Sequence, residues 1–391
     1  MRTLKRLLAL LVALVVVTCL AGYFAVPGIA DRLMNKRAID PPYPRDEAAE
    51  ALHKQLVVAD LHNDVLLWGR DITQRASHGH VDLPRLRDGN FAIAVFSTVT
   101  QTPKGINYES NDSTTDQIGL LARVELWPLR TWNSRTQRAL FQAQRFYDAA
   151  AKTRGELLLL TKRSAVDSLL ARRVRGEQVV GALLSTEGLH ALDGKLEHVD
   201  TLFAHGFRML GLTHFFDNDI AASAHGLSKG GLTPLGRLVL HRMELLNMIV
   251  DVAHASPATV NDVLRMATRP VIVSHTGVQA TCPGPRNLTD DQLKAIAATG
   301  GVVGIGYWDG AICTPTAESA AKAIRHAVNV AGIDYVALGS DWDGATTEPF
   351  DASGISLVTA ALLKERFTAE EIAKIIGGNF VRVLKASLPP G

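Results

Sequence analysis

The stretch Leu56-Val57-Val58-Ala59-Asp60-Leu61-His62-Asn63-Asp64 begins as an apolar, β-branched run and ends in polar residues. A short apolar run of this kind predicts a buried strand. Because side chains alternate along a strand, His62 and Asp64 are expected to point the same way. An imidazole and a carboxylate together at a strand end form half of a metal site, although a strand that runs into a polar turn gives the same pattern.

Seven further runs with strand character follow, near residues 91–98, 179–186, 207–213, 248–253, 271–274, 302–307 and 335–340. Segments of helical periodicity lie between most of them, for example 196–205, 233–247, 257–267, 289–298 and 317–331. Eight strand–helix units over about 330 residues predict an α/β fold, the (β/α)8 or TIM barrel. A doubly wound sheet is the weaker alternative, because no glycine-rich phosphate-binding turn follows the first strand.

Polar residues stand at the ends of six of these strands, where a barrel carries its catalytic groups. They are His62, Asp64, Glu187, His214, His254, His275 and Asp341. Strand ends without a function normally carry Ser, Thr, Gly or Asn in turns. Position and residue type together therefore predict a metal centre at this end of the barrel.

Imidazole and carboxylate ligands suit Zn²⁺. His62 and Asp64 can serve one ion and His254 and His275 another, with Glu187 bridging the two. Two such ions share a water molecule, lower its pKa to give a hydroxide nucleophile, and polarise a substrate carbonyl. Asp341 is placed to take the proton from that water and pass it to a leaving nitrogen. The expected reaction is amide hydrolysis.

Composition limits the alternatives. A hydrophobic content of 47% and a charged content of 20% indicate a globular chain, and a net charge of +2 gives no electrostatic reason to expect nucleic acid as a partner. The chain has three cysteines, Cys19, Cys282 and Cys313, and no CxxC motif. Since Cys19 lies in an N-terminal apolar run, at most one pair remains in the folded part, so any metal must be held by His and carboxylate side chains.

The N-terminus predicts export. Three basic residues (Arg2, Lys5 and Arg6) precede an uncharged run at 7–26, which is long enough for one membrane-spanning helix. Positive charge before the run predicts a membrane anchor with the catalytic domain on the extracytoplasmic, periplasmic side. A signal peptide that is cleaved after Gly28-Ile29-Ala30, giving a secreted protein, is the alternative.

This pattern divides the chain into an anchor or signal segment at 1–38, a Pro-rich linker to about residue 48, and a catalytic domain at 49–388. Residues 100–155, between the second and third predicted strands, contain an amphipathic stretch at 135–152. A connection of this length with its own helices is usually an insertion over one barrel face. It is expected to be either a lid or a partner surface.

Seven motifs occur in an order and with spacings that resemble one family. They are Asp60-Leu-His-Asn-Asp64, Thr186-Glu-Gly188, Leu212-Thr-His214, Asp251-Val-Ala-His-Ala-Ser256, Val271-Ile-Val-Ser-His275, Arg286-Asn287 and Gly339-Ser-Asp-Trp-Asp-Gly344. With them, residues 55–385 resemble the membrane (renal) dipeptidases, peptidase family M19, a binuclear zinc branch of the amidohydrolase superfamily. The long insertion and the N-terminal apolar run differ from the animal members, and Cys282 and Cys313 need not form a disulfide here.

The resemblance implies two Zn²⁺ ions per chain and hydrolysis of dipeptides, including those with a D-residue in second place. It also implies a homodimer. It assigns metal ligation to His62, Asp64, Glu187, His254 and His275, with Glu187 bridging. It assigns carbonyl contact to His214, recognition of the substrate's C-terminal carboxylate to Arg286, and acid–base catalysis to Asp341, with Asp343 as the alternative.

Two other hypotheses remain open from the sequence. The first is a related amidohydrolase that acts on N-acyl amino acids or lactams, and the second is an inactive envelope binding module. Arg286 favours a substrate with a free carboxylate, because a guanidinium group matches a carboxylate with two parallel hydrogen bonds. The complete set of ligand residues together with Asp341 argues against an inactive barrel.

Overall fold

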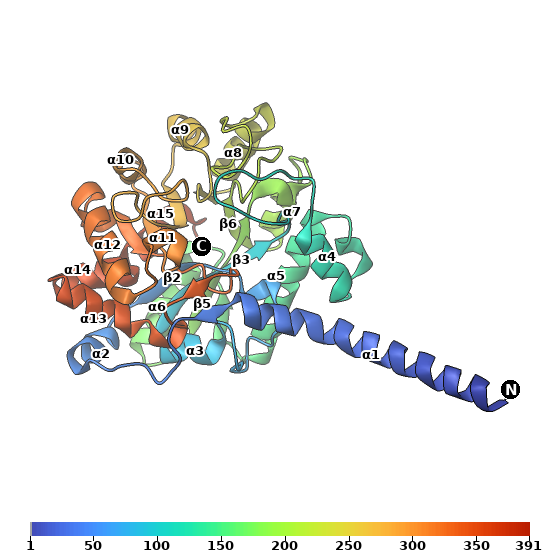
Figure 1. The fold of residues 1–391 in the computed structure, drawn as a ribbon. Coiled ribbons are helices and arrows are strands. Elements are labelled where there is room, and N and C mark those ends of the chain that lie inside the picture. The colour runs from blue at the N-terminus through green and yellow to red at the C-terminus, as the bar shows by residue number, and fades with distance from the viewer. Residues whose placement is uncertain (1) are drawn as a thin grey trace.

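The computed structural model describes residues 2–391, apart from the side chains of residues 3, 19–21, 23 and 24. Eight parallel strands form a nearly closed barrel that is surrounded by helices (Figure 1). In spatial order the strands are β2 (Val58–Asn63), β3 (Phe91–Val99), β5 (Val180–Glu187), β6 (Phe207–Gly211), β7 (Ile249–Asp251), β8 (Val271–Thr276), β9 (Val303–Ile305) and β10 (Val336–Leu338). The predicted TIM barrel and its eight strands are confirmed.

The barrel closes where β10 meets β2. Beyond the end of β10, the backbone N–H of Asp341 donates to the carbonyl oxygen of His62 (3.2 Å), and that of Asp64 donates to the carbonyl oxygen of Trp342 (2.9 Å). A parallel bridge between Asn63 and Trp342 completes the seam. The first and last strands of the barrel are therefore joined at His62, Asp64 and Asp341, three of the candidate catalytic residues.

Helices cover the outside of the barrel. They are α2 (Glu47–His53), α3 (Leu83–Asp88), α6 (Arg163–Val174), α7 (His198–Ala204), α8 (Pro234–Leu245), α9 (Pro257–Met266), α10 (Asp290–Ala298), α11 (Asp309–Ile312), α12 (Ala317–Ala331), α13 (Ser356–Lys364), α14 (Ala369–Ala373) and α15 (Asn379–Ser387). Side-chain caps explain where several begin: Thr233 caps α8, Ser256 caps α9, and Thr289 forms a capping box with Gln292 at α10. The strands are buried throughout, as expected for a parallel sheet that is covered on both faces.

The predicted insertion is helical and packs on the barrel. It contains α4 (Gln117–Val124), a 3₁₀ turn (Leu129–Thr131) and α5 (Arg135–Lys152). The Gln142 side chain of α5 joins both backbone groups of Val99 at the end of β3, donating to its carbonyl oxygen at 2.8 Å. A short strand that the sequence did not predict, β4 (Leu157–Leu159), then pairs with β5.

The N-terminal run forms the helix α1 (Arg2–Met34). Among the residues that the structure describes, no helix has the combination of length and apolar character that a membrane span requires, so the predicted transmembrane helix is not supported. The side chain of Cys19, one of the three cysteines, lies outside the described residues.

The segment predicted as a Pro-rich linker makes contacts with the folded domain. Its strand β1 (Lys36–Arg37) pairs in parallel with β11 (Thr347–Glu348), and the Tyr43 hydroxyl accepts a hydrogen bond from the backbone of Asp351 (3.0 Å). We call residues 31–43 the N-terminal strap. The folded domain therefore begins before residue 49, because a Pro-rich composition does not show whether a segment docks on a neighbour.

Cys282 and Cys313 form a disulfide, the pairing that the sequence left open. Cys282 lies in the loop between β8 and α10, and Cys313 directly follows α11. The bond therefore ties together two loops above neighbouring strands, at the end of the barrel where the candidate catalytic residues lie.

Replacing Cys282 and Cys313 together with Ala is expected to lower the free energy of unfolding by about 2–4 kcal/mol, because the bond closes a loop of 31 residues in the unfolded chain. Urea denaturation of the oxidised protein and of the double variant measures this difference. Reduced wild-type protein serves as the control and is expected to match the variant. Equal stability of the oxidised and reduced wild-type proteins would contradict the prediction.

Candidate active site

The seven polar residues predicted at strand ends lie at one end of the barrel. His62 and His275 are within β2 and β8, and Glu187 is the last residue of β5. Asp64 directly follows β2, and His214, His254 and Asp341 each lie three residues beyond the end of their strands. Every one of them is buried, with at most 9% of its surface exposed. The strand ends therefore concentrate imidazole and carboxylate groups in a space that bulk water does not fill.

Glu187 is the centre of this cluster. Its Oε1 lies 3.5 Å from Nε2 of His62, 3.2 Å from Nε2 of His254 and 3.4 Å from Nε2 of His275. Its Oε2 lies 3.3 Å from Nε2 of His214. One carboxylate thus contacts four imidazoles that come from four different strands.

Two groups of candidate ligand atoms share Glu187. One contains His62, Glu187, His275 and Asp341, and the other contains Glu187, His214 and His254; within each group the ligand atoms lie within 4.8 Å of one another. The sequence had instead paired His254 with His275. Their Nε2 atoms are only 3.0 Å apart, so the structure is also compatible with that pairing. Asp64 lies outside both groups, with its Oδ1 3.5 Å from Nε2 of His62.

Burial disfavours the charged form of most groups in the cluster. It lowers the pKa of His214, His254 and His275 well below the usual range and raises the pKa of Glu187 well above it. Burial alone would also lower the pKa of His62, but Asp64 and Glu187 outweigh it and raise that pKa to about 10.

The donor set fits a metal ion. Neutral imidazoles direct their nitrogen atoms at a carboxylate and at one another, and His62 Nε2 and Asp64 Oδ1 are buried without a hydrogen-bond partner. A cation between these atoms would coordinate the nitrogen lone pairs and stabilise the ionised carboxylates. His and carboxylate ligands without a thiolate are typical of a catalytic zinc site.

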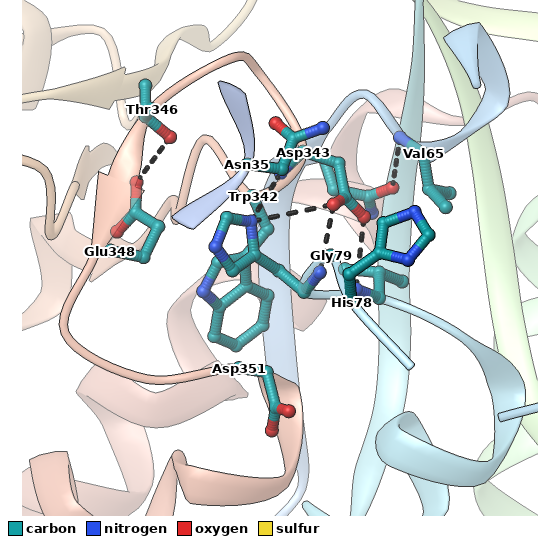
Figure 2. Close-up of polar contacts among 12 residues, drawn as sticks. Asn35, Val65, His78, Gly79, Trp342, Asp343, Thr346, Glu348 and Asp351 are labelled. Carbon is teal, nitrogen blue, oxygen red and sulfur yellow. Dashed lines mark hydrogen bonds and ion pairs between the residues drawn. The ribbon is translucent and has the colours of Figure 1, made fainter. Parts of the chain in front are cut away.

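The two aspartates that follow β10 have different surroundings. Asp341 lies near the cluster, with its Oδ1 3.9 Å from Nε2 of His62, and burial raises its pKa to about 7. Asp343 forms an ion pair with Arg70 (2.7 Å). Its carboxylate also accepts hydrogen bonds from the backbones of His80 (2.9 Å) and Val81 (3.0 Å). Figure 2 shows Asp343 among several polar contacts. The geometry therefore favours Asp341 over Asp343 as the group that reaches a substrate.

The loop that carries Asp341 is conformationally strained. Asp341, Asp343 and Ala345 have φ values of 63°, 63° and 62°, and each such non-glycine residue costs about 1–3 kcal/mol. The N-terminal strap holds this loop: the Asn35 side chain accepts a hydrogen bond from the backbone of Ala345 (2.9 Å), and β1 pairs with β11 directly beyond it. Asp31 of the strap also pairs with Arg70 at 2.9 Å.

Arg286 is a buried cation without a carboxylate partner among the described residues. One of its terminal nitrogens donates to the carbonyl oxygen of His275 (2.8 Å) and lies 3.3 Å from Nε2 of His254. Its guanidinium carbon lies 5.2 Å from the centre of the Trp308 ring. A buried charge is costly unless it is paired, so this site is suited to an anionic group of a ligand.

Several further residues hold the strand ends in place. Asp60 accepts hydrogen bonds from the backbone and hydroxyl of Ser340 (2.8 and 2.9 Å). Ser274 is 2.8 Å from Nδ1 of His275 and fixes that ring. Asn218 forms a turn in the loop after His214, where its side chain accepts a hydrogen bond from the backbone of Ile220 (2.8 Å). Ser274 immediately precedes a predicted ligand, but a serine at this position does not by itself predict a contact with the His275 ring.

A parallel barrel with a buried His and carboxylate cluster at the carboxyl ends of its strands defines a metal-dependent hydrolase. The chain belongs to the membrane dipeptidase family, peptidase family M19, whose family model matches residues 46–388. It is a metallo-dipeptidase, as the family resemblance in the sequence implied.

Two curated relatives are dipeptidases by name. The chain is 30% identical over 319 residues to an uncharacterized dipeptidase of Schizosaccharomyces pombe, which covers 78% of this chain and 72% of the relative. It is 27% identical over 376 residues to the dipeptidase aclJ of Aspergillus oryzae, which covers 88% of this chain and 82% of the relative.

Solved structures share the fold. The probable dipeptidase PvdM of Pseudomonas aeruginosa superposes with a TM-score of 0.74 at 20% identity, over 88% of this chain and 99% of that chain. A metallopeptidase of Rhodobacter sphaeroides, bound to a phosphinate mimic of the dipeptide L-Ala-D-Ala, gives 0.70 at 24% identity, over 85% and 99% of the two chains.

Replacing Asp343 with Asn is expected to lower the free energy of unfolding by about 3–5 kcal/mol at pH 7, because Arg70 would lose one of its two buried carboxylate partners. The matched control is Asp40→Asn in the same region, since Asp40 is 77% exposed and its pair with Arg37 is expected to contribute at most about 1 kcal/mol. Chemical denaturation measures both. Equal losses in the two variants would contradict the structural role of Asp343.

Wild-type protein and the Asp343→Asn variant also test how the stability contribution of Asp343 depends on pH. Burial alone would raise the pKa of Asp343, but Arg70 and His80 hold it well below the usual range, so its charge stabilises the fold above the unfolded-state pKa of about 3.8. This contribution is lost as the pH falls below that value. The stability difference between wild-type protein and Asp343→Asn is therefore expected to narrow between pH 5 and pH 3.

Proposed function

We propose that this dipeptidase holds two zinc ions through His62, Asp64, Glu187, His254 and His275, with Glu187 bridging. The observation that carries the proposal is the Glu187 carboxylate, which lies within 3.5 Å of an imidazole nitrogen from each of four strands. Sharing of one carboxylate between two groups of ligand atoms supports two ions rather than one. The nitrogen and oxygen donors support zinc.

When bound, the two ions would supply a water of lowered pKa and would polarise the substrate carbonyl. The protein's own groups have the remaining roles. Asp341, whose pKa burial raises to about 7, accepts the proton of the water and delivers it to the leaving nitrogen. His214, which burial keeps neutral and which lies 3.3 Å from Oε2 of Glu187, contacts the carbonyl oxygen of the substrate.

The substrate is a dipeptide with a free C-terminal carboxylate, which Arg286 binds. Support comes from the burial of this guanidinium group without an acidic partner among the described residues, close to His254 and His275. The L-Ala-D-Ala mimic bound by the Rhodobacter sphaeroides relative supports the further proposal that this chain accepts a D-residue at the second position.

We also propose that the catalytic domain works outside the cytoplasm. The basic residues Arg2, Lys5 and Arg6 before the apolar run support export, and the Cys282–Cys313 disulfide supports an oxidising compartment. The contacts of the strap begin at Asp31. Cleavage after Ala30 would therefore leave these contacts intact, so the cleaved form is consistent with the fold.

The function is tested with full-length protein by metal analysis and by hydrolysis of matched L-L and L-D dipeptides. We expect about two zinc ions per chain and chelator-sensitive cleavage of both series. The His254→Ala variant is expected to lose more than about 100-fold in kcat/KM, since even residues behind a ligand cost 10- to 100-fold, and to bind less zinc. The matched control is His326→Ala, because His326 lies on α12 and pairs with the surface residue Asp290.

Each negative outcome identifies which part of the proposal is wrong. Two bound zinc ions without dipeptide cleavage would contradict the dipeptide substrate and favour N-acyl amino acids or lactams. Cleavage of L-L but not L-D dipeptides would contradict only the proposal that the chain accepts a D-residue at the second position. Wild-type activity and zinc content in the His254→Ala variant would contradict the site.

The location is tested by fractionating a Gram-negative host that expresses the full chain. The catalytic domain is expected outside the cytoplasm with the Cys282–Cys313 bond formed, and replacing Arg2, Lys5 and Arg6 with Glu is expected to retain reduced protein in the cytoplasm. Mass spectrometry of trapped thiols gives the redox state. A wild-type chain found reduced in the cytoplasm would contradict the proposal.

A further inference from the structure

The first part of the insertion, the loop between β3 and α4, reaches the candidate active site through Tyr108. The carbonyl oxygen of Tyr108 accepts a hydrogen bond from Nδ1 of His225 (2.7 Å), and the backbone N–H of Asn111 donates to the carbonyl oxygen of His225 (2.7 Å). These contacts fix a part of the insertion that is otherwise largely exposed. Tyr108 itself is half-buried, so the insertion directs one aromatic residue inward.

The Tyr108 side chain lies between two aromatic residues that contact the metal-site histidines. Its ring stacks on Phe215 with 6.1 Å between centroids, and its hydroxyl oxygen accepts a hydrogen bond from Nε1 of Trp308 (3.1 Å). Phe215 lies 5.2 Å from the His254 ring, and Trp308 lies 5.7 Å from the His275 ring. Tyr108 is therefore one residue removed from both histidines.

A glycine on the opposite wall makes room for the phenol. A side chain at Gly310, in α11, would place its Cβ atom 2.4 Å from the Tyr108 hydroxyl oxygen and 2.7 Å from Nε1 of Trp308. Any residue other than glycine would therefore displace the hydroxyl from its present position. The pairing of Tyr108 with Gly310 is a specific steric fit between the insertion and the loop after β9.

The hydroxyl hydrogen of Tyr108 is free to donate. The oxygen accepts from Trp308, and no acceptor for its hydrogen is found among the described residues. Burial raises the pKa of Tyr108 although Arg286 opposes the shift, so the phenol stays protonated at neutral pH. Arg286 lies over the face of the same Trp308 ring whose N–H edge contacts Tyr108. Two donors without an anionic partner thus flank one tryptophan.

We propose that Tyr108 is a specificity-determining residue, whose hydroxyl donates a hydrogen bond to the same C-terminal carboxylate that Arg286 binds. The proposal rests on the dipeptide function above and assigns a role to the insertion: it supplies a second hydrogen-bond donor to the carboxylate, in addition to Arg286 of a barrel loop. The partner is a free carboxylate next to the scissile amide. An amide or ester at that position cannot use both donors equally well, because it lacks the negative charge.

The test compares inhibition of the zinc-loaded full chain by a phosphinate dipeptide mimic and by the C-terminal amide of the same mimic. Tyr108→Phe is expected to weaken binding of the acid about 10-fold, the typical loss of a hydrogen bond to a charged group, and to leave binding of the amide unchanged. With dipeptide substrates the loss is expected in KM rather than in kcat. Tyr147→Phe is the matched control, since its hydroxyl donates to the carbonyl oxygen of His205 away from this site.

A second variant tests the same contact without removing the phenol. Gly310→Ala is expected to displace the Tyr108 hydroxyl and to give the same selective loss, and the double variant is expected to lose no more than either single variant. Equal weakening of acid and amide by Tyr108→Phe, or no weakening of either, would overturn the role of Tyr108. If the wild-type protein cleaves dipeptides but does not distinguish acid from amide, recognition of the carboxylate fails together with this proposal. If it cleaves no dipeptide, the proposed function itself fails.

Discussion

The Glu187 carboxylate, buried among the imidazoles of His62, His214, His254 and His275, is the interaction on which the site depends. Burial opposes charge on Glu187 and on three of these histidines, and a cation between them would stabilise the ionised carboxylate. Four strands have to end at the same height to bring these groups together. The barrel supplies this, because all of its strands are parallel and their carboxyl ends lie at the same end of the barrel.

The seam between β10 and β2 has to hold a strained loop as well as close the barrel. The left-handed residues Asp341, Asp343 and Ala345 persist because contacts from outside the barrel fix them. These contacts come partly from the strap, whose residues precede the first residue matched by the family model, residue 46. A segment outside the residues matched by the family model thus contributes to the position of Asp341.

The strands and most of the site were predictable because their signals are local. An apolar run ending in a polar residue identifies both a strand and the end at which it can act, and the same rule located His62, Glu187, His254 and His275. The strap, the disulfide and Tyr108 were not predictable in this way. Each depends on a contact between distant segments, such as Asn35 with Ala345. The sequence around one partner contains nothing that predicts the other.

The insertion illustrates how such a contact can change specificity while the barrel stays the same. The metal ligands come from strand ends and cannot move without breaking the register of the sheet, whereas Tyr108 comes from a loop that ends at α4 and is fixed mainly by hydrogen bonds to His225. Its position requires a glycine at 310 and an indole N–H at Trp308. Because the proposed metal ligands include none of these three residues, the proposed contact of Tyr108 with a carboxylate can be lost or gained without a change of metal ligand.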